Sequence, residues 1–164
     1  MGFQGIEHYV PDSVYATLAH RLADRDPAEL RIQTEECLKF LIIASETDPL
    51  FIPMTREVDE VWHELILQTH FYAELCRRLP GGRFIHHQSL ELADYAAGGH
   101  QPGEPDKSDK PDLLGELMFW LPAYVSRFGE FTPERARYWS VTQYLHDIHG
   151  ISLDAVNSAA RVPS

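Results

Sequence analysis

The sequence predicts an all-α protein, a single compact domain of about five to six helices. Three observations support this prediction. Apolar residues recur at helical spacing in several long segments, residues that begin or cap helices precede most of these segments, and no segment shows the alternating pattern of a strand. A chain of 164 residues with 44% apolar content is also long and apolar enough to bury a core.

The first helices are predicted over residues 14–22 and from Pro27 to about residue 46. Asp26 can cap the second of them, and proline suits its first turn. The second half of this helix is apolar on most sides, so we expect it at the centre of the core. Residues 48–54 contain two prolines, which predicts an extended segment lying against the core.

The longest predicted helix covers residues 56–79, and Gly81 and Gly82 end that region. A short extended segment or turn follows over residues 84–87, and Ser89 can cap a brief helix that continues to Tyr95.

The C-terminal half is predicted to begin with a mobile loop over residues 96–110, rich in glycine, proline and charge, which is either disordered or a lid. A strongly apolar helix should cover 113–128. Thr132 and Pro133 should begin a last helix that ends near residue 149. Residues 1–10 and 152–164 are expected to be loosely ordered.

The charge balance disfavours two classes of partner. The 25 acidic and 14 basic residues give a net charge of −11, whereas nucleic acids and anionic membranes demand basic patches. No apolar run approaches the roughly 20 residues of a membrane span, and the N-terminus lacks the pattern of a signal peptide. We therefore expect a cytoplasmic protein with Cys37 and Cys76 as reduced core residues.

The most informative residues lie on the helix predicted over 56–79. Asp59, His63 and His70 fall within roughly 40° of one another around its axis. The i, i+4 spacing of Asp59 and His63 lets one helix offer two ligands to one ion. His86 and His87 can supply the remaining ligands. In an extended chain only one of them would face the ion, whereas a turn would let both bind.

The same residues have a second interpretation. Asp59 can bond His63 while His87 bonds the backbone, which gives a buried polar network without metal. Spacing alone leaves both interpretations open. His70 is the weakest candidate, because a histidine on a helix surface is usually just solvated.

Several neighbouring side chains are candidates for supporting roles. Glu64 adjoins His63 and can reach a water bound to the ion, so Glu64 and Tyr72 are the catalytic candidates. Trp62, His70 and Phe84 are expected to line the pocket.

The motifs Val58-Asp59-Glu60-Val61-Trp62-His63 and Phe84-Ile85-His86-His87, with Tyr72 and Cys76 between them, carry a resemblance. The chain resembles small bacterial proteins related to the glycine-rich domain-containing family. The mark of that family is an Asp-x-x-Trp-His helix followed by a tyrosine, a cysteine and a His-His pair. The resemblance covers roughly residues 35–90 and implies that these motifs form one site. In that pattern position 70 is more often arginine than histidine.

Taken together, these features predict a small metal-dependent enzyme with Asp59, His63, His86 and His87 as ligands of Fe, Zn or Cu. With Fe or Cu we expect an oxidoreductase that modifies a small molecule or peptide in a biosynthetic pathway. With Zn, a hydrolase or lyase is favoured. The rival hypothesis is a non-catalytic interaction module in which the Trp-His/His-His cluster is a structural polar core. There the acidic surface or the 96–110 loop would contact a protein partner.

Overall fold

The computed structural model describes residues 6–47, 52–87 and 113–161, with side chains of the last range described from Phe119 onward. In these ranges the chain forms helices and no strand, so the all-α prediction is confirmed. The helices are η1 (Glu7–Tyr9), α1 (Asp12–Arg21), α2 (Pro27–Ser45), α3 (Arg56–Leu67), α4 (Thr69–Arg78), α6 (Leu113–Phe128), α7 (Pro133–Ala136), α8 (Ser140–His149) and α9 (Leu153–Ala160).

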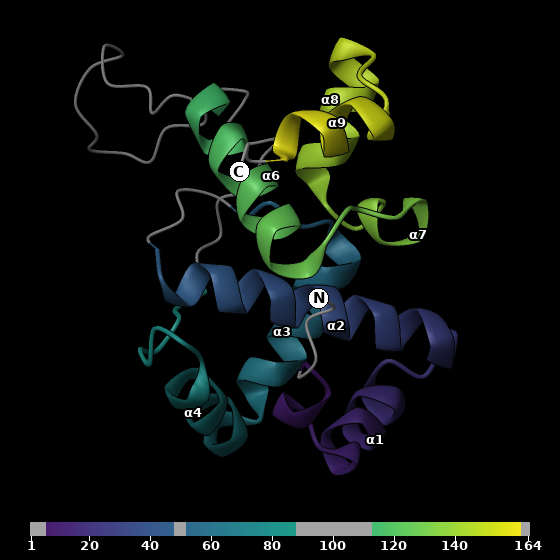
Figure 1. The fold of residues 1–164 in the computed structure, drawn as a ribbon. Coiled ribbons are helices and arrows are strands. Elements are labelled where there is room, and N and C mark those ends of the chain that lie inside the picture. The colour runs from purple at the N-terminus through teal and green to yellow at the C-terminus, as the bar shows by residue number, and fades with distance from the viewer. Residues whose placement is uncertain (1–5, 48–51, 88–112, 162–164) are drawn as a thin grey trace, which may run out of the picture.

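Helix α2 crosses the middle of the molecule (Figure 1). On one side it contacts α1 and α3, with α4 packed on α3, and on the other it contacts α6 and α7. Every residue from Glu36 to Ser45 is buried, as the apolar second half of this helix predicted. The helix begins where the sequence indicates, because the Asp26 side chain accepts hydrogen bonds from the N–H groups of Ala28 and Glu29, each at 3.1 Å.

A short extended segment, residues 52–54, connects the elements that pack on the two sides of α2. Met54 forms an antiparallel bridge with Trp139. The flanking backbone bonds run from Thr55 N–H to the Tyr138 carbonyl (2.9 Å) and from Ser140 N–H to the Pro53 carbonyl (2.8 Å). The extended form predicted for this region is confirmed over residues 52–54; the preceding four residues lie outside the described ranges.

The helix predicted over 56–79 is instead two helices, so that prediction was wrong. Helix α3 ends at Leu67 and α4 begins at Thr69, with Gln68 in a non-helical conformation (φ −85°, ψ 67°). No proline or glycine marks this break. Because the chain changes direction there, both Leu65 on α3 and Leu75 on α4 reach the core. Tertiary packing has overridden local helix preference.

The last predicted helix, over residues 133–149, is also divided. Trp139 adopts extended angles (φ −103°, ψ 109°) because its backbone pairs with Met54, and this separates α7 from α8. Helix α8 ends as predicted at Gly150, which has the left-handed φ of 64° that glycine tolerates.

The expectation of a loose tail after residue 152 was wrong over α9. The Ser152 hydroxyl caps this helix by accepting from Ala155 N–H at 3.2 Å. The Asn157 side chain fixes it to the chain before α7, since its amide accepts from Phe131 N–H (2.8 Å) and donates to the Phe131 carbonyl (3.0 Å).

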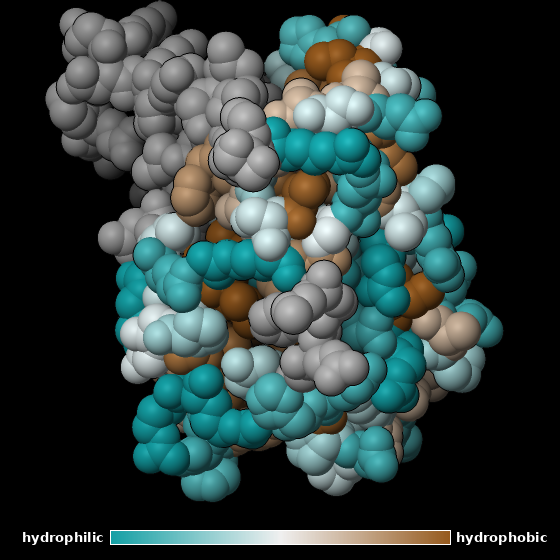
Figure 2. All heavy atoms as spheres, in the orientation of Figure 1, coloured by the Kyte–Doolittle hydropathy of each residue, from teal (hydrophilic) through white to brown (hydrophobic). Residues whose placement is uncertain are grey.

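The surface is predominantly polar in the view of Figure 2, with apolar side chains scattered among charged ones. No helix within the described residues combines the length and the apolar character needed to cross a membrane. The loop predicted over 96–110 and the brief helix predicted after Ser89 lie outside the described residues.

Candidate metal centre

Helix α3 places a carboxylate and an imidazole one turn apart. Asp59 Oδ2 lies 3.3 Å from His63 Nε2, as the i, i+4 spacing predicts. The Asp59 side chain is 15% exposed and that of His63 is 55% exposed. The pair therefore sits at the rim of the buried face of α3, with the carboxylate inside and the imidazole open to solvent.

The segment over residues 84–87 brings a second imidazole to the same carboxylate. His87 Nε2 lies 2.7 Å from Asp59 Oδ1, and the rings of His63 and His87 are 4.2 Å apart. One ligand atom from each of the three side chains lies within 4.8 Å of the others. This group of three, Asp59, His63 and His87, is called the triad below.

A buried hydrogen-bonded pair holds the segment that carries His87. The Tyr72 hydroxyl donates to the Ile85 carbonyl and accepts from Trp62 Nε1–H at 3.0 Å. The Trp62 ring packs on the His87 ring with centroids 4.5 Å apart. Tyr72 on α4 thus holds the backbone next to His87, and Trp62 on α3 contacts the His87 ring.

The residues just before this segment, from Gly81 to Arg83, are bonded to the C-terminal end of α2. Arg83 donates to the carbonyls of Ser45 (3.0 Å) and Ala44 (2.9 Å), and Gly81 N–H donates to the Ser45 hydroxyl at 3.1 Å. The two Arg83 bonds reach carbonyls of the last turn of α2, where a helix has no further intrahelical donors. The sequence indicated Gly81 only as a helix terminator, and it gave no signal for the contact with α2.

His86 and His70 lie outside the triad. The His86 ring packs against the Phe84 ring, with centroids 4.8 Å apart, and His86 is not one of the three residues of the triad. His70 is exposed on α4, beyond the break at Gln68 that removes it from the edge of α3. A ligand role for His86 and a pocket role for His70 stay predictions.

The two catalytic candidates already have partners. Glu64 pairs with Arg21 of α1. Burial raises the pKa of the Tyr72 phenol, and its hydroxyl donates to a backbone carbonyl. The structure therefore gives Tyr72 a positioning role, and a direct part in catalysis for either residue stays a prediction.

A second polar cluster, around Glu36, was missed by the sequence analysis. The fully buried Glu36 carboxylate accepts from Tyr124, Trp139 and Arg135 and pairs with Lys39. The Glu36–Lys39 spacing of three residues was the available signal, but its partners lie about a hundred residues away and nothing local predicts them.

Replacing Tyr72 with phenylalanine should reduce the free energy of unfolding by about 1–3 kcal/mol, because the buried Ile85 carbonyl and Trp62 indole lose their partner. Urea denaturation measures the loss. A matched control is Tyr15→Phe, since the half-buried Tyr15 contacts Arg31 through its ring face, which phenylalanine retains. Equal stability of the Tyr72 variant and the wild type would contradict the anchoring role.

The predicted reduced state of the two cysteines agrees with the structure, where Cys37 and Cys76 are free and buried. Burial, and then the nearby Asp59 charge, raises the pKa of the Cys37 thiol. A neutral thiol beside the triad fits a packing residue better than a nucleophile.

A family model described as UCP032817-like matches residues 4–98, which include α1 to α4 and the whole triad. No curated protein and no solved structure matches the chain. The finer resemblance to glycine-rich domain-containing proteins stays a prediction. Because the match covers more than half of the 164 residues, the chain belongs to the UCP032817-like family.

Proposed function

We propose that the chain is a small metalloenzyme whose triad binds one divalent transition ion, with Fe²⁺ the favoured ion and oxidation of a small molecule or peptide the favoured chemistry. The observation that carries the proposal is the convergence of two imidazoles and one carboxylate within 4.8 Å. The exposed His63 leaves one side of the group open to water or substrate.

The ligand chemistry favours iron over the other candidates. Two histidines and one carboxylate with open positions are the ligand set of non-haem Fe²⁺ oxygenases. Zn²⁺ also accepts three protein ligands and a water, so a zinc-dependent hydrolase or lyase is the second candidate. Cu(I) is less favoured, because soft sulfur ligands select it and the triad consists of two imidazoles and a carboxylate.

In this proposal the surrounding residues position the ligands. Trp62 and Tyr72 hold His87 in place, as outer hydrogen bonds and ring contacts do for many metal ligands. Glu64, adjacent to His63, remains the candidate to accept a proton from a bound water. Phe84, 48% exposed, is the candidate to contact substrate at the rim.

A non-catalytic interaction module is the alternative, and one observation favours it. Asp59 already lies within bonding distance of both histidines, at 2.7 Å and 3.3 Å, so the network is satisfied without an ion. Under this alternative the triad only joins the 84–87 segment to α3, and the acidic surface contacts a protein partner.

Metal binding separates these functions. Protein purified without oxygen and supplied with Fe²⁺, Zn²⁺ or Cu²⁺ in turn should retain about one Fe²⁺ per chain after desalting, measured by elemental analysis, and should melt at a higher temperature when loaded. His63→Ala should abolish retention with little loss of helix content, because this side chain is half exposed. The matched control is His86→Ala, which removes the neighbouring imidazole outside the triad and should retain the ion.

Three results would count against the proposal. Retention of less than about a fifth of an ion per chain with unchanged melting temperature would favour the interaction module. Selective retention of Zn²⁺ would favour the hydrolase or lyase. Loss of the ion in His86→Ala but not in His63→Ala would show that the ligand set is wrong.

A further inference from the structure

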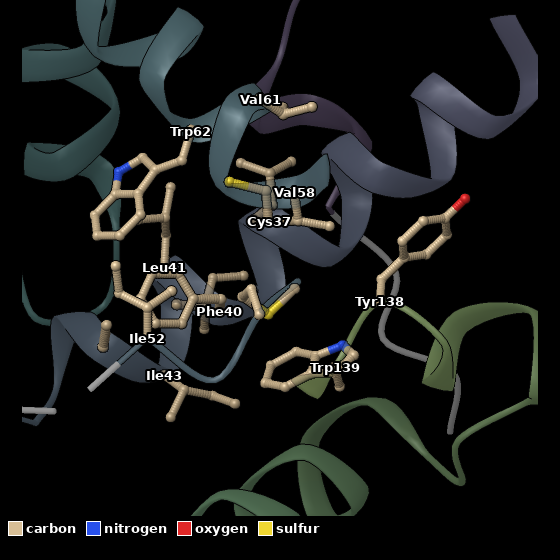
Figure 3. Packing of buried hydrophobic residues seen from close by; sticks show 14 of the residues in the cluster. Cys37, Phe40, Leu41, Ile43, Ile52, Val58, Val61, Trp62, Tyr138 and Trp139 are labelled. Carbon is tan, nitrogen blue, oxygen red and sulfur yellow. The ribbon is translucent and has the colours of Figure 1, made fainter. Parts of the chain in front are cut away.

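Aromatic rings form a continuous row from the triad through the core. Each ring contacts the next, and Figure 3 shows Phe40 in the part of the core between Trp62 and Trp139. The centroid distances are 4.5 Å for His87–Trp62, 5.0 Å for Trp62–Phe40, 5.6 Å for Phe40–Trp120, 6.1 Å for Trp120–Trp139 and 5.1 Å for Trp139–Tyr124.

The row contains the side chains that can be oxidised by one electron. Tryptophan and tyrosine lose an electron far more readily than other side chains, apart from thiols. Only Phe40 lies between Trp62 and Trp120, so an electron needs to tunnel past a single ring. All five rings from Trp62 to Tyr124 are at most 2% exposed, which protects an oxidised ring from water.

The far end of the row has a base in place. The Tyr124 hydroxyl donates to Glu36 Oε1 at 2.7 Å and accepts from Lys39 Nζ at 3.0 Å. A phenol loses an electron much more easily when its proton can move at the same time. At Tyr124 that movement needs only the existing hydrogen bond.

The other members of the row have no such base, with one exception. Among the described residues Trp120 Nε1–H has no acceptor, and Trp62 donates to a neutral hydroxyl. Trp139 also donates to Glu36, at 3.2 Å, but an indole radical is a stronger oxidant than a tyrosyl radical. An oxidised tryptophan in this row is therefore expected to take an electron from Tyr124.

We propose that this row carries an oxidising equivalent from the triad's ion to Tyr124, where it is held as a tyrosyl radical. The proposal rests on a redox-active ion in the triad. Hydrogen peroxide takes two electrons from the ferrous ion, its O–O bond breaks, and with two protons from solvent both of its oxygen atoms become water. One electron then moves from Tyr124 along the row to the ion, the Tyr124 proton moves to Glu36, and the ion is left in the ferric state. The row would thus keep unused oxidising equivalents away from the triad's own histidines.

Rapid-freeze EPR on the full chain tests the row. Iron-loaded protein is mixed with hydrogen peroxide, frozen within milliseconds and examined for a radical. We expect a tyrosyl signal whose hyperfine pattern narrows when the protein is made with ring-deuterated tyrosine and not with ring-deuterated tryptophan. This labelling identifies the radical without any substitution in the core.

Substitutions then locate the radical. Tyr124→Phe should remove the tyrosyl signal and Trp120→Phe should lower its yield severalfold. Tyr144→Phe should leave it unchanged, because Tyr144 on α8 packs against His149 and is not in the row. Iron content is measured on every sample, so that loss of the ion is distinguished from loss of the path.

Two outcomes would overturn the proposal. If iron is bound but no tyrosyl radical forms, or if the radical survives in Tyr124→Phe, the row does not carry the oxidising equivalent to Tyr124. The proposed metal site is not affected by either result. If iron is not retained at all, the proposed function and the row fail together.

Discussion

Replacing Glu36 with glutamine is expected to lower the free energy of unfolding by about 3–5 kcal/mol, the range found when one partner of a buried ion pair is removed. Glu36 Oε2 lies 2.7 Å from Lys39 Nζ and 2.9 Å from Arg135 Nη1. Its side chain is fully buried, and that of Lys39 is only 10% exposed. Without the carboxylate, the buried Lys39 ammonium loses its ion-pair partner, and Arg135 keeps only its pair with Glu35.

The cost should be large because Glu36 joins three parts of the fold. Its carboxylate connects α2 to Tyr124 of α6, to Arg135 of α7 and to the Trp139 indole. Burial lowers the pKa of the Lys39 ammonium, although the Glu36 charge opposes that effect. Without the Glu36 charge, only burial would act strongly on Lys39, so keeping its ammonium charged in the core would account for the largest part of the lost stability.

A neighbouring glutamate provides the control. Glu35 also pairs with Arg135, at 2.8 Å, but its side chain is 20% exposed. Glu35→Gln should cost less than about 1 kcal/mol, as partly exposed pairs do. Adding Lys39→Met to Glu36→Gln should recover part of the loss. Chemical denaturation of the four proteins gives these values, and equal losses for the two single glutamine variants would contradict a special role for Glu36.

Replacing Gly81 with alanine should be the second severe change, at or above the upper end of the roughly 1–3 kcal/mol typical of overpacking. A Cβ built on Gly81 lies 1.7 Å from the Ser45 carbonyl oxygen and 2.4 Å from its carbon. These are backbone atoms at the end of α2, so no side-chain rotation relieves the clash. The 81–87 segment must move, and with it His87.

Gly81→Ala is therefore expected to weaken metal retention as well as stability, although Gly81 is not in the triad. Gly150→Ala is the control: it strains a left-handed residue (φ 64°) but meets nothing within 4 Å, so it should cost about 1 kcal/mol and leave the ion bound. Denaturation and elemental analysis of both variants measure these effects. A Gly81→Ala protein with wild-type iron content would show that the contact with α2 does not position His87.

The helices that sequence predicted well are those whose signals are local. Asp26 and Pro27 fix the start of α2, and α6 covers the predicted residues 113–128. The errors have a non-local cause. Gln68 leaves the helical conformation between α3 and α4, whose apolar faces pack into the same core. Trp139 is extended because its backbone pairs with Met54, which lies 85 positions earlier in the chain.

The candidate site shows the same division. Asp59 and His63 meet because they are one turn apart on a helix, and the i, i+4 rule was sufficient to pair them. The sequence left open whether one or both of His86 and His87 face the carboxylate, since an extended chain would allow one and a turn both. The choice of His87 depends on Tyr72 holding the Ile85 carbonyl, a contact between α4 and the segment that no local pattern encodes.

Crystals of the iron-loaded protein, grown without oxygen and measured at the iron absorption edge, test the central claim most directly. The account predicts one anomalous peak within coordination distance of the Asp59 carboxylate and of Nε2 of both His63 and His87, with the His86 ring directed away from it. A peak at any other group of residues, or no peak in crystals of protein that carries iron in solution, would contradict the account.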